Sequence, residues 1–214
     1  LIMKTYPHFF IRFLTAIDRD VNCIVTNFDS NNNDITNNMN RKLKITEMDR
    51  LTIDEFKKVD KIPFIVILDN IRSMHNIGSV FRTADAFCLE MIYLCGITAT
   101  PPNAEIHKTA LGAEETVSWK YLENTIDAVN QVRERGYKVF SIEQAVGSTM
   151  LNDLQLNKGE KIAVVLGNEV KGVQQEVINQ SDLCLEIPQY GTKHSLNVSV
   201  TSGIVIWDLF NKLK

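Results

Sequence analysis

The chain has 214 residues, 44% of them hydrophobic and 23% charged, which is an ordinary globular composition and a length that fits one domain with an extra segment. Its formal net charge of −3 argues against a surface that coats nucleic acid broadly, although a local basic patch stays compatible with it. No apolar stretch is long enough to cross a bilayer, and the N-terminus lacks the features of a signal peptide, so we expect a cytoplasmic protein.

The four cysteines, Cys23, Cys88, Cys95 and Cys184, are widely spread and form no C-x-x-C pair. The sequence therefore indicates neither a zinc site nor a dithiol redox site, and we predict no metal ligands. Three of the cysteines, at positions 88, 95 and 184, lie in apolar runs. We expect them to be free thiols buried in a reducing compartment.

Residues 1–40 differ in composition from the rest of the chain. Seven asparagines fall between positions 27 and 40, and such a segment buries little apolar surface. We therefore expect a poorly ordered N-terminal extension whose first 38 residues are dispensable. A small accessory helix over residues 9–17 is the alternative.

A short helical segment is predicted next, over residues 41–60. Within it we expect the helix over residues 46–60, where Leu51, Phe56 and Val59 form an apolar stripe among charged residues, and Pro63 ends that pattern.

From residue 61 to 214, strands and helices alternate. Residues 64–68 are a continuous, β-branched apolar run, which suits a parallel strand buried on both faces. The alternation predicts an α/β domain with a mostly parallel sheet, whose ligands bind beyond the carboxyl ends of the strands. The further expected strands are residues 91–95, 137–142, 161–166 and 182–187, and the expected helices are residues 77–87, 125–135, 173–180 and 195–213.

The loop after the first strand opens a helix. Gly78 and Ser79 are small, so another backbone or a ligand can approach the start of the helix. Asn76 stands where an N-cap or a ligand contact belongs, and Arg82 follows about one turn after Gly78. The alternative is a capping Asn and a solvated surface Arg.

A glycine-rich turn, residues 166–172, joins the fourth strand to a helix. It resembles a phosphate cradle, but Glu169 would repel phosphate, and neither a P-loop nor a G-x-G-x-x-G pattern is present. A carboxylate here suits a cationic ligand or an Arg partner. The alternative is a solvated Glu at a helix start.

A third loop, residues 187–194, leads into the terminal helix, whose first turn carries Ser195 and Asn197. Capping alone explains Ser195. Asn197 is harder to explain structurally, because Asn is a poor helix former.

Together the three loops resemble the sequence motifs of the SpoU/TrmH group of SPOUT RNA methyltransferases. Asn76–Thr83 matches N-x-G-(A/S)-x-x-R-(T/S), Leu166–Gly172 matches L-G-N-E-x-x-G, and Ile187–Val198 matches I-P-x-x-G-x-x-x-S-L-N-V. The motifs occur in the family's order and on the expected strand–loop–helix junctions. Two positions depart from the family pattern: Val170 replaces a frequent Gly, and Gln189 replaces a frequent Met.

The resemblance implies an α/β fold with helices on both faces of a mostly parallel sheet and a trefoil knot near the C-terminus, within residues 61–214. It implies methyl transfer from S-adenosylmethionine to a ribose 2′-hydroxyl of tRNA or rRNA, without a metal, by a homodimer whose active site lies at the subunit interface. By position, the residues expected to bind the donor are Ile142, Gly167, Ile187, Ser195 and Leu196.

Arg82 is the key catalytic residue that the resemblance implies. Because a free arginine stays protonated, it is a poor general base. It would instead stabilise the developing alkoxide or hold the adjacent phosphate, and both roles stay open. The residues expected to orient Arg82, the ribose and the donor are Asn76, Glu169, Ser195 and Asn197, and those expected as phosphate contacts or ordinary surface charge are Arg72, His75, Lys108, Lys171, Lys193 and His194.

Two rival functions come from other classes. A non-catalytic RNA-binding module could keep the knotted fold, but it would not need Asn76, Arg82, Glu169 and Asn197 together. A dehydrogenase or another nucleotide-binding enzyme would carry the glycine fingerprint that this sequence lacks.

Overall fold

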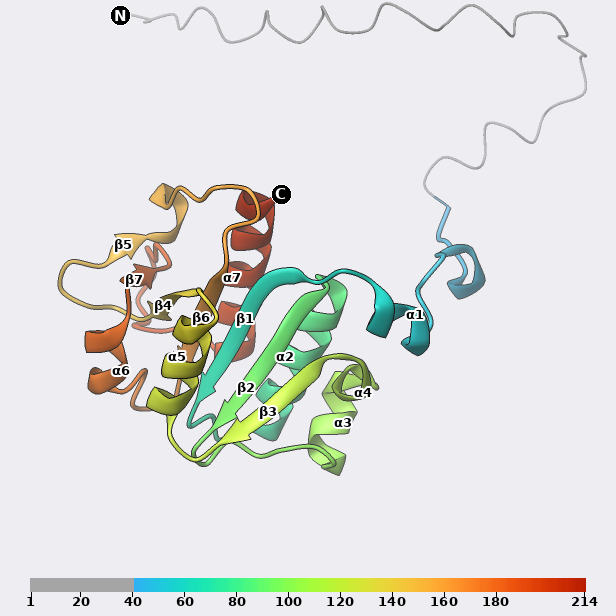
Figure 1. The fold of residues 1–214 in the computed structure, drawn as a ribbon, viewed down its shortest axis with the longest axis horizontal. Helices are drawn as coiled ribbons and strands as arrows, with labels where there is room; N and C mark the ends of the chain where they lie inside the picture. Colours follow the sequence, from blue (N-terminus) through green and yellow to red (C-terminus); the bar gives the residue numbers. More distant parts are fainter. Residues whose placement is uncertain (1–40) are drawn as a thin grey trace, which may run out of the picture. The chain divides into compact units, whose positions relative to one another are not determined.

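The computed structural model describes residues 41–214, so the extension predicted for residues 1–40 lies outside the described residues. The chain divides into two units, Leu1–Asp49 and Arg50–Lys214. The second unit is an α/β domain (Figure 1), whose elements are α1 (Ile53–Lys58), β1 (Ile62–Asp69), α2 (Met74–Ala86), β2 (Leu89–Cys95), α3 (Ala104–Ala110), α4 (Ala113–Thr116), β3 (Ser118–Leu122), α5 (Thr125–Glu134), β4 (Lys138–Ile142), β5 (Thr149–Met150), η2 (Leu151–Asp153), β6 (Ile162–Gly167), α6 (Gln175–Gln180), β7 (Leu183–Glu186) and α7 (Val198–Leu213).

The helix predicted over residues 46–60 is wrong in its extent. The described part of the first unit contains a short 3₁₀ helix, η1 (Ile45–Glu47), and α1 in the second unit has six residues. A six-residue helix makes less than two turns, which is too short to carry the predicted stripe. Of that stripe, only Phe56 is buried, whereas Leu51 and Val59 are exposed.

The second unit is built on one sheet of seven strands in the order β3-β2-β1-β6-β4-β7-β5. Every neighbouring pair is parallel. β1 lies between β2 and β6, so Ile65 pairs with Met91 on one side and with Ala163 on the other. The predicted parallel α/β sheet is confirmed. Strand order alone does not test the trefoil knot, which stays a prediction.

Hydrophobic side chains cover both faces of this sheet. Phe64, Val66 and Leu68 of β1 pack into one core cluster and Ile65 and Ile67 into the other, and all five are completely buried. This alternation explains the continuous apolar run in the sequence, because each face of a central parallel strand needs its own apolar residues.

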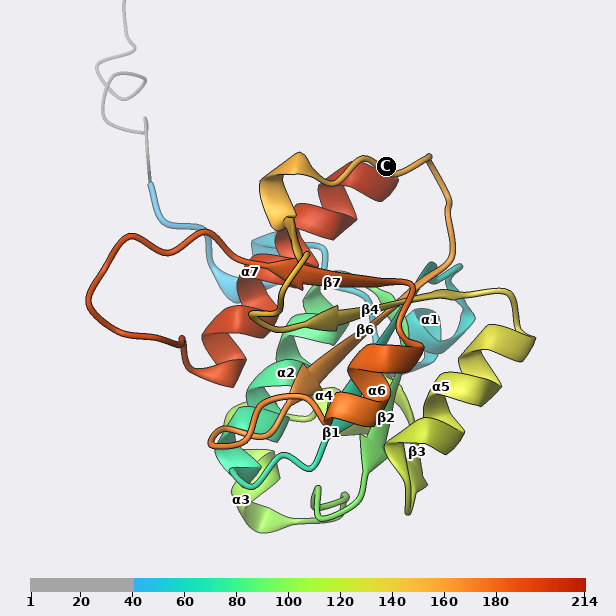
Figure 2. The same ribbon diagram turned by 90° about the vertical axis from the view of Figure 1, so that its left-hand side faces the viewer.

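Helices supply the other half of each core. α2, α3 and α7 cover one face of the sheet, and α5 and α6 cover the other, as Figures 1 and 2 show. The expectation of helices on both faces is therefore confirmed. No helix within residues 41–214 has the length and apolar character needed to span a membrane.

Residues 104–122 hold three elements that the sequence did not predict. α3 and α4 have seven and four residues, which is shorter than the window over which a helical period can be recognised. β3 is an edge strand with five residues, none of them buried. An edge strand that is not buried needs no continuous apolar run, and the sequence of β3 has none.

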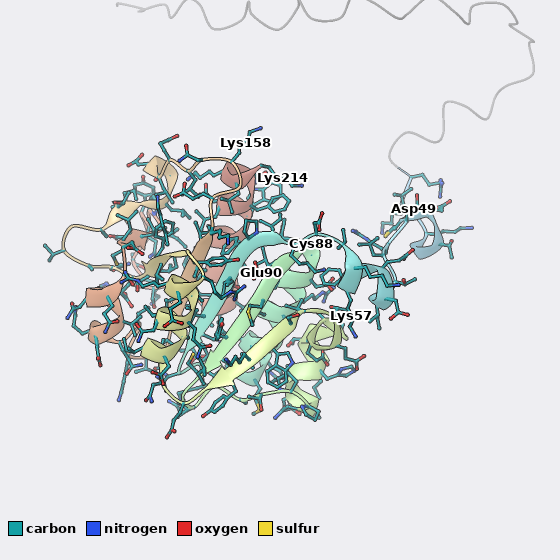
Figure 3. The ribbon with its side chains drawn as sticks, in the orientation of Figure 1. Asp49, Lys57, Cys88, Glu90, Lys158 and Lys214 are labelled. Atoms are coloured by element: carbon teal, nitrogen blue, oxygen red, sulfur yellow. The ribbon has the colours of Figure 1, made fainter. Side chains whose placement is uncertain are left out.

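Cys88, Cys95 and Cys184 are free thiols, but the prediction that all three are buried holds for Cys95 alone. Burial raises the pKa of Cys95 to about 12, and the nearby Asp69 carboxylate adds to this shift. Cys88 and Cys184 are only half-buried, and Figure 3 places Cys88 near Glu90 at the start of β2. Within residues 41–214, no three His, Cys, Asp or Glu side chains gather as a potential metal site.

Gly78 lies where α2 packs against α3. A Cβ atom at this position would lie 2.3 Å from the carbonyl oxygen of Ile106 and 2.2 Å from Oγ1 of Thr109. Both distances are far inside van der Waals contact. The prediction that another backbone approaches Gly78 is therefore confirmed, and the backbone is that of α3.

We predict that Gly78→Ala destabilises the domain by about 1–3 kcal/mol, the usual cost of overpacking. This loss would occur although Ala favours a helix interior over Gly by about 1 kcal/mol. The control is Ser79→Ala, which removes one hydrogen bond to the carbonyl of His75 and should change stability by at most about 0.5 kcal/mol. Urea unfolding measures both variants. If Gly78→Ala were as stable as the wild type, α2 and α3 could move apart enough to accept a methyl group without an energetic cost.

Candidate active site

A cleft of about 1090 Å³ opens at the carboxyl ends of β4, β6 and β7. This is the edge of a parallel sheet where ligands bind in α/β proteins. The cleft is lined by residues 142–146, 166–173, 185–187 and 194–198, together with Gln175, Ile178, Asn179, Gln189 and Thr201.

The loop after β6 folds back on itself through Asn168 and Gly172. Their backbones exchange hydrogen bonds of 3.1 and 2.9 Å. Oδ1 of Asn168 accepts hydrogen bonds of 3.0 Å from the N–H groups of Val170 and Lys171, and its Nδ2 donates to the carbonyl of Asn70 at 2.7 Å. A single Asn side chain thus shapes this loop and attaches it to the end of β1.

Gly167 and Glu143 fix the base of the same loop. A Cβ atom on Gly167 would lie 2.1 Å from the backbone nitrogen of Val173, so the turn requires glycine here. The Glu143 carboxylate accepts hydrogen bonds from the N–H groups of Val173 at 3.0 Å and Gln144 at 2.9 Å. Glu143 was not predicted as a site residue. It joins the loop after β4 to the loop after β6.

Glu169 connects the loop after β6 to the start of α2. One carboxylate oxygen accepts a hydrogen bond of 3.0 Å from the N–H of Arg72, and the other accepts bonds of 3.0 Å from the N–H of Ser73 and from Nδ2 of Asn76. Unpaired N–H groups and the helix dipole make a helix N-terminus favourable for a carboxylate. The structure therefore brings Asn76 and Glu169 together: Glu169 is exposed, as the alternative interpretation expected, but its carboxylate is hydrogen-bonded to the start of α2.

The environment of Glu169 acts on its pKa in two directions. Partial burial raises the pKa, but hydrogen bonds from the backbones of Arg72, Glu169 and Ser73 and from the Asn76 side chain outweigh this, so the pKa is lowered from its ordinary value of 4.5. Glu169 is therefore held as a carboxylate at neutral pH. With its oxygens engaged by three donors, it is placed to hold two loops together.

Asn76 and Asn197 have different local roles from those the sequence suggested. α2 begins at Met74 because Ser73 caps it, so Asn76 lies inside the first turn and is buried. Asn197 is the N-cap of α7, where its Oδ1 accepts a hydrogen bond of 2.8 Å from the N–H of Ser199. The predicted start of α7 at Ser195 is therefore wrong, and capping explains Asn197.

Sequence reasoning missed Asp69, a completely buried acid at the end of β1. Its Oδ1 accepts hydrogen bonds from Nδ2 of Asn70 at 2.8 Å, Oγ1 of Thr125 at 2.6 Å and Nε2 of Gln174 at 2.7 Å, and its Oδ2 accepts one from the N–H of Gln174 at 2.9 Å. A buried charge needs such partners. The signal in the sequence was an acid that ends an apolar strand. Asp69 fixes the start of α6 next to β1.

All of the residues predicted to bind the donor line the cleft; they are Ile142, Gly167, Ile187, Ser195 and Leu196. Glu169 and Asn197 also line it, whereas Asn76 lies behind Glu169. The second and third motif loops therefore meet at one cavity, and the first motif is joined to it through the hydrogen bond between Asn76 and Glu169.

The single chain does not bring Arg82, the predicted key catalytic residue, to the cleft. It lies on α2, is exposed, and is not among the residues that line the cavity. Within residues 41–214, it takes part in no ion pair. Its guanidinium is therefore available to a group outside this chain.

The residues predicted as phosphate contacts fall into two groups. His75 and Lys108 both contact the Glu105 carboxylate, at 3.1 and 2.6 Å, so these side chains have a partner within the chain. The others are exposed and take part in no ion pair within the described part of the chain; they are Arg72, Lys171, Lys193 and His194. Lys171 and His194 also line the cleft.

Comparison with known families gives a match over most of the domain. Residues 63–207 match the model of the SpoU rRNA Methylase family. An uncharacterized tRNA/rRNA methyltransferase of Borreliella burgdorferi is 30% identical over 82% of this chain and 75% of its own length. The 23S rRNA (guanosine-2′-O-)-methyltransferase RlmB of Neisseria meningitidis is 30% identical over 72% of this chain and 60% of its own length. The chain thus spans less than two thirds of the length of the latter relative.

Solved structures show the same fold. An rRNA methyltransferase of Sinorhizobium meliloti with bound AdoMet superposes with a TM-score of 0.67 and 27% identity, over 74% of this chain and 60% of that chain. The TrmH/SpoU tRNA modifying enzyme of A. aeolicus superposes with a TM-score of 0.66 and 23% identity, over 75% of this chain and 81% of that chain.

We predict that Glu169→Gln weakens the pH dependence of stability. The folded-state pKa of Glu169 lies below its ordinary value of 4.5, so its contribution is present above that value and is lost as pH falls through the folded pKa. The variant should therefore be less stable than the wild type at pH 7, and the difference should shrink below about pH 4.

Urea unfolding at a series of pH values measures this difference. The matched control is Glu115→Gln, because the exposed Glu115 side chain makes no hydrogen bond with the described residues. If the stability difference caused by Glu169→Gln were the same at pH 7 and pH 3, the carboxylate would not be the group that holds the two loops.

Proposed function

Because the chain belongs to the SpoU rRNA Methylase family, we propose that it transfers a methyl group from S-adenosylmethionine to a ribose 2′-hydroxyl of tRNA or rRNA. The main support for the proposal is the lining of the cleft. It contains Gly167 from the second family motif and Ile187 and Ser195 from the third. The Neisseria relative is a 23S rRNA (guanosine-2′-O-)-methyltransferase, and the Borreliella relative is an uncharacterized tRNA/rRNA methyltransferase.

The cleft suits S-adenosylmethionine in size and in chemistry. Its volume of about 1090 Å³ is at the upper end of small-molecule sites, which leaves room for the donor and for part of an acceptor. Ile142, Ile187 and Leu196 offer apolar surface for an adenine ring. Glu143 and Glu186 give the cleft a negative charge, which suits a ligand with a sulfonium and an ammonium group.

When bound, S-adenosylmethionine supplies a methyl group on a positively charged sulfur, which is already activated for attack by an oxygen. The protein must therefore align the ribose hydroxyl and stabilise the charge that develops on its oxygen. Arg82 is the group that we assign to this charge or to the adjacent phosphate. Glu169 and Asn76 act as positioning residues, because their mutual hydrogen bond fixes the start of the helix that carries Arg82.

We propose further that a second copy of the chain completes the site. Val200, Ile204 and Trp207 are 50%, 38% and 57% exposed and lie on one face of α7, since their spacing is four and three residues. This apolar stripe borders α2, because the Trp207 ring lies 5.7 Å from that of Phe87 at the end of α2. Arg82 lies on α2, so a partner packed on the stripe would lie beside the helix that carries this exposed side chain.

Calorimetry should show that S-adenosylmethionine binds and that a chelator leaves the affinity unchanged, because the activated sulfonium needs no metal ion. Leu196→Asn, in the cleft, should weaken binding about tenfold, which is about 1.4 kcal/mol. The control Leu111→Asn changes an exposed leucine outside the cleft and should have no effect. Strict dependence of binding on a divalent ion would refute the proposed site. Donor binding without methyl transfer to any RNA would favour a binding module.

We predict that Arg82→Ala lowers turnover about a hundredfold or more, the scale of one lost transition-state contact, and leaves donor affinity within a few-fold. Lys should rescue poorly, because a point charge does not reproduce the planar, two-pronged contact. Arg50→Ala, at another exposed arginine, is the control. Near wild-type transfer by Arg82→Ala would show that the catalytic centre is assigned wrongly, and a collapse of donor binding would place Arg82 in the donor pocket.

The subunit contact has its own test. We predict that the wild-type protein sediments as a dimer and that Val200→Glu, on the stripe, sediments as a monomer with unchanged helical content, because a buried charge without a partner is costly. The control Ile97→Glu changes a residue that is 65% exposed and lies outside α7. A wild-type monomer that transfers methyl groups at full rate would contradict this arrangement.

A further inference from the structure

Three apolar side chains stand out in solvent around the cleft. Val146 is 109% exposed, Tyr190 is 98% exposed and Val170 is 77% exposed, and they are the three most exposed large hydrophobic residues among those described. Val146 and Val170 line the cleft from the loops after β4 and β6, and Tyr190 lies in the loop after β7, whose residues Gln189 and His194 line it. We call Val146, Val170 and Tyr190 the apolar rim. Large apolar side chains exposed on the loops of a cleft are available to a bound ligand.

The acidic and the basic side chains near this rim differ in their surroundings. The three acids of the cleft are hydrogen-bonded within the loops. Glu143 accepts hydrogen bonds from the Val173 and Gln144 N–H groups, and Glu186 accepts one of 2.8 Å from Ser148. Glu169 is exposed, but its carboxylate oxygens accept hydrogen bonds from the start of α2. The cations are exposed beside the rim. Lys171 follows Val170, and Lys193 and His194 follow Tyr190 in the same loop; all three are exposed. Between residues 187 and 197 the sequence contains no acid. The rim therefore faces solvent with apolar and basic groups.

Tyr190 is the only aromatic member of the rim. The Tyr190 hydroxyl makes no hydrogen bond with residues 41–214. Because the residue is 98% exposed, both faces of its ring are open to solvent. Tyr121, the other exposed tyrosine of the described residues, is 45% exposed and donates a hydrogen bond of 3.0 Å to the carbonyl of Gly96. The loop that carries Tyr190 arches out at the left of Figure 2, with β7 and α7 at its two ends.

We propose that Tyr190 stacks on a nucleobase of single-stranded RNA, at or next to the nucleotide whose ribose enters the cleft, and that Lys193 and Lys171 contact its phosphates. The inference rests on the proposed function and names its substrate class. An aromatic ring can reach the face of a base only where the base is unstacked, which excludes the interior of a regular duplex. An exposed ring with cations beside it is the combination by which proteins bind single strands.

The test measures binding of two fluorescein-labelled RNAs by fluorescence anisotropy: an unstructured 12-nucleotide strand and a blunt duplex of the same length. Tyr190→Ala should weaken binding of the single strand about fivefold to a hundredfold, the range for one lost stacking contact. Tyr190→Phe keeps the ring and should stay within twofold of the wild type. The duplex should bind equally to all three proteins. Tyr121→Ala is the matched control and should leave single-strand binding unchanged.

Two further readouts separate the possible failures. S-adenosylmethionine affinity and the sedimentation coefficient should be the same in Tyr190→Ala and the wild type. If the wild type does not bind the donor, the proposed function itself fails. If the donor binds but Tyr190→Ala binds single-stranded RNA like the wild type, only the stacking role is overturned. If the variant changes its oligomeric state, or weakens duplex and single strand equally, Tyr190 belongs to a subunit contact or to the scaffold of the loop, and the inference is wrong.

Discussion

The structure of the site depends on one carboxylate at the N-terminus of a helix. Glu169 accepts three hydrogen bonds, from the Arg72 and Ser73 N–H groups and from the Asn76 side chain, and so joins two loops that are almost one hundred residues apart in the sequence. This pairing is favourable for both partners. The N–H groups at the start of the helix gain an acceptor, and the partly buried carboxylate gains hydrogen-bond donors. The same contact sets the position of α2, and therefore of Arg82.

This contact is possible because β1 and β6 are neighbours in the sheet. Asp69, the last residue of β1, pairs with Gly167, the last residue of β6, so the loops that follow leave the sheet side by side. Asp69 and Asn168 then hold them together: the first through Gln174 at the start of α6, and the second through the carbonyl of Asn70. The cleft is thus built from backbone turns that are fixed by polar side chains, of which Asp69 is buried and Asn168 half-buried. A rigid support of this kind suits a reaction that depends on alignment.

The sequence predicted those parts of the structure that leave a strong local pattern. Central strands such as β1 are buried on both faces, and their continuous apolar runs made them recognisable. The residues around the cleft followed from the motif resemblance, and the structure places Gly167, Ile187 and Ser195 there. What depends on distant contacts could not be predicted. The buried role of Asp69 requires knowledge of Thr125 and Gln174, and nothing local in the sequence shows that Arg82 stays outside the cleft of its own chain.

The central claim is that the cleft directs a methyl group to a ribose oxygen, and the most direct measurement is the chemical position of the transferred label. Unfractionated tRNA and rRNA would be incubated with the protein and S-adenosylmethionine labelled in the methyl group, and then hydrolysed with alkali. Alkaline cleavage requires a free 2′-hydroxyl next to the phosphate, so a 2′-O-methylated nucleotide survives in a dinucleotide. The account predicts that the label is recovered in alkali-resistant dinucleotides. Label recovered in mononucleotides that carry a methylated base would contradict it.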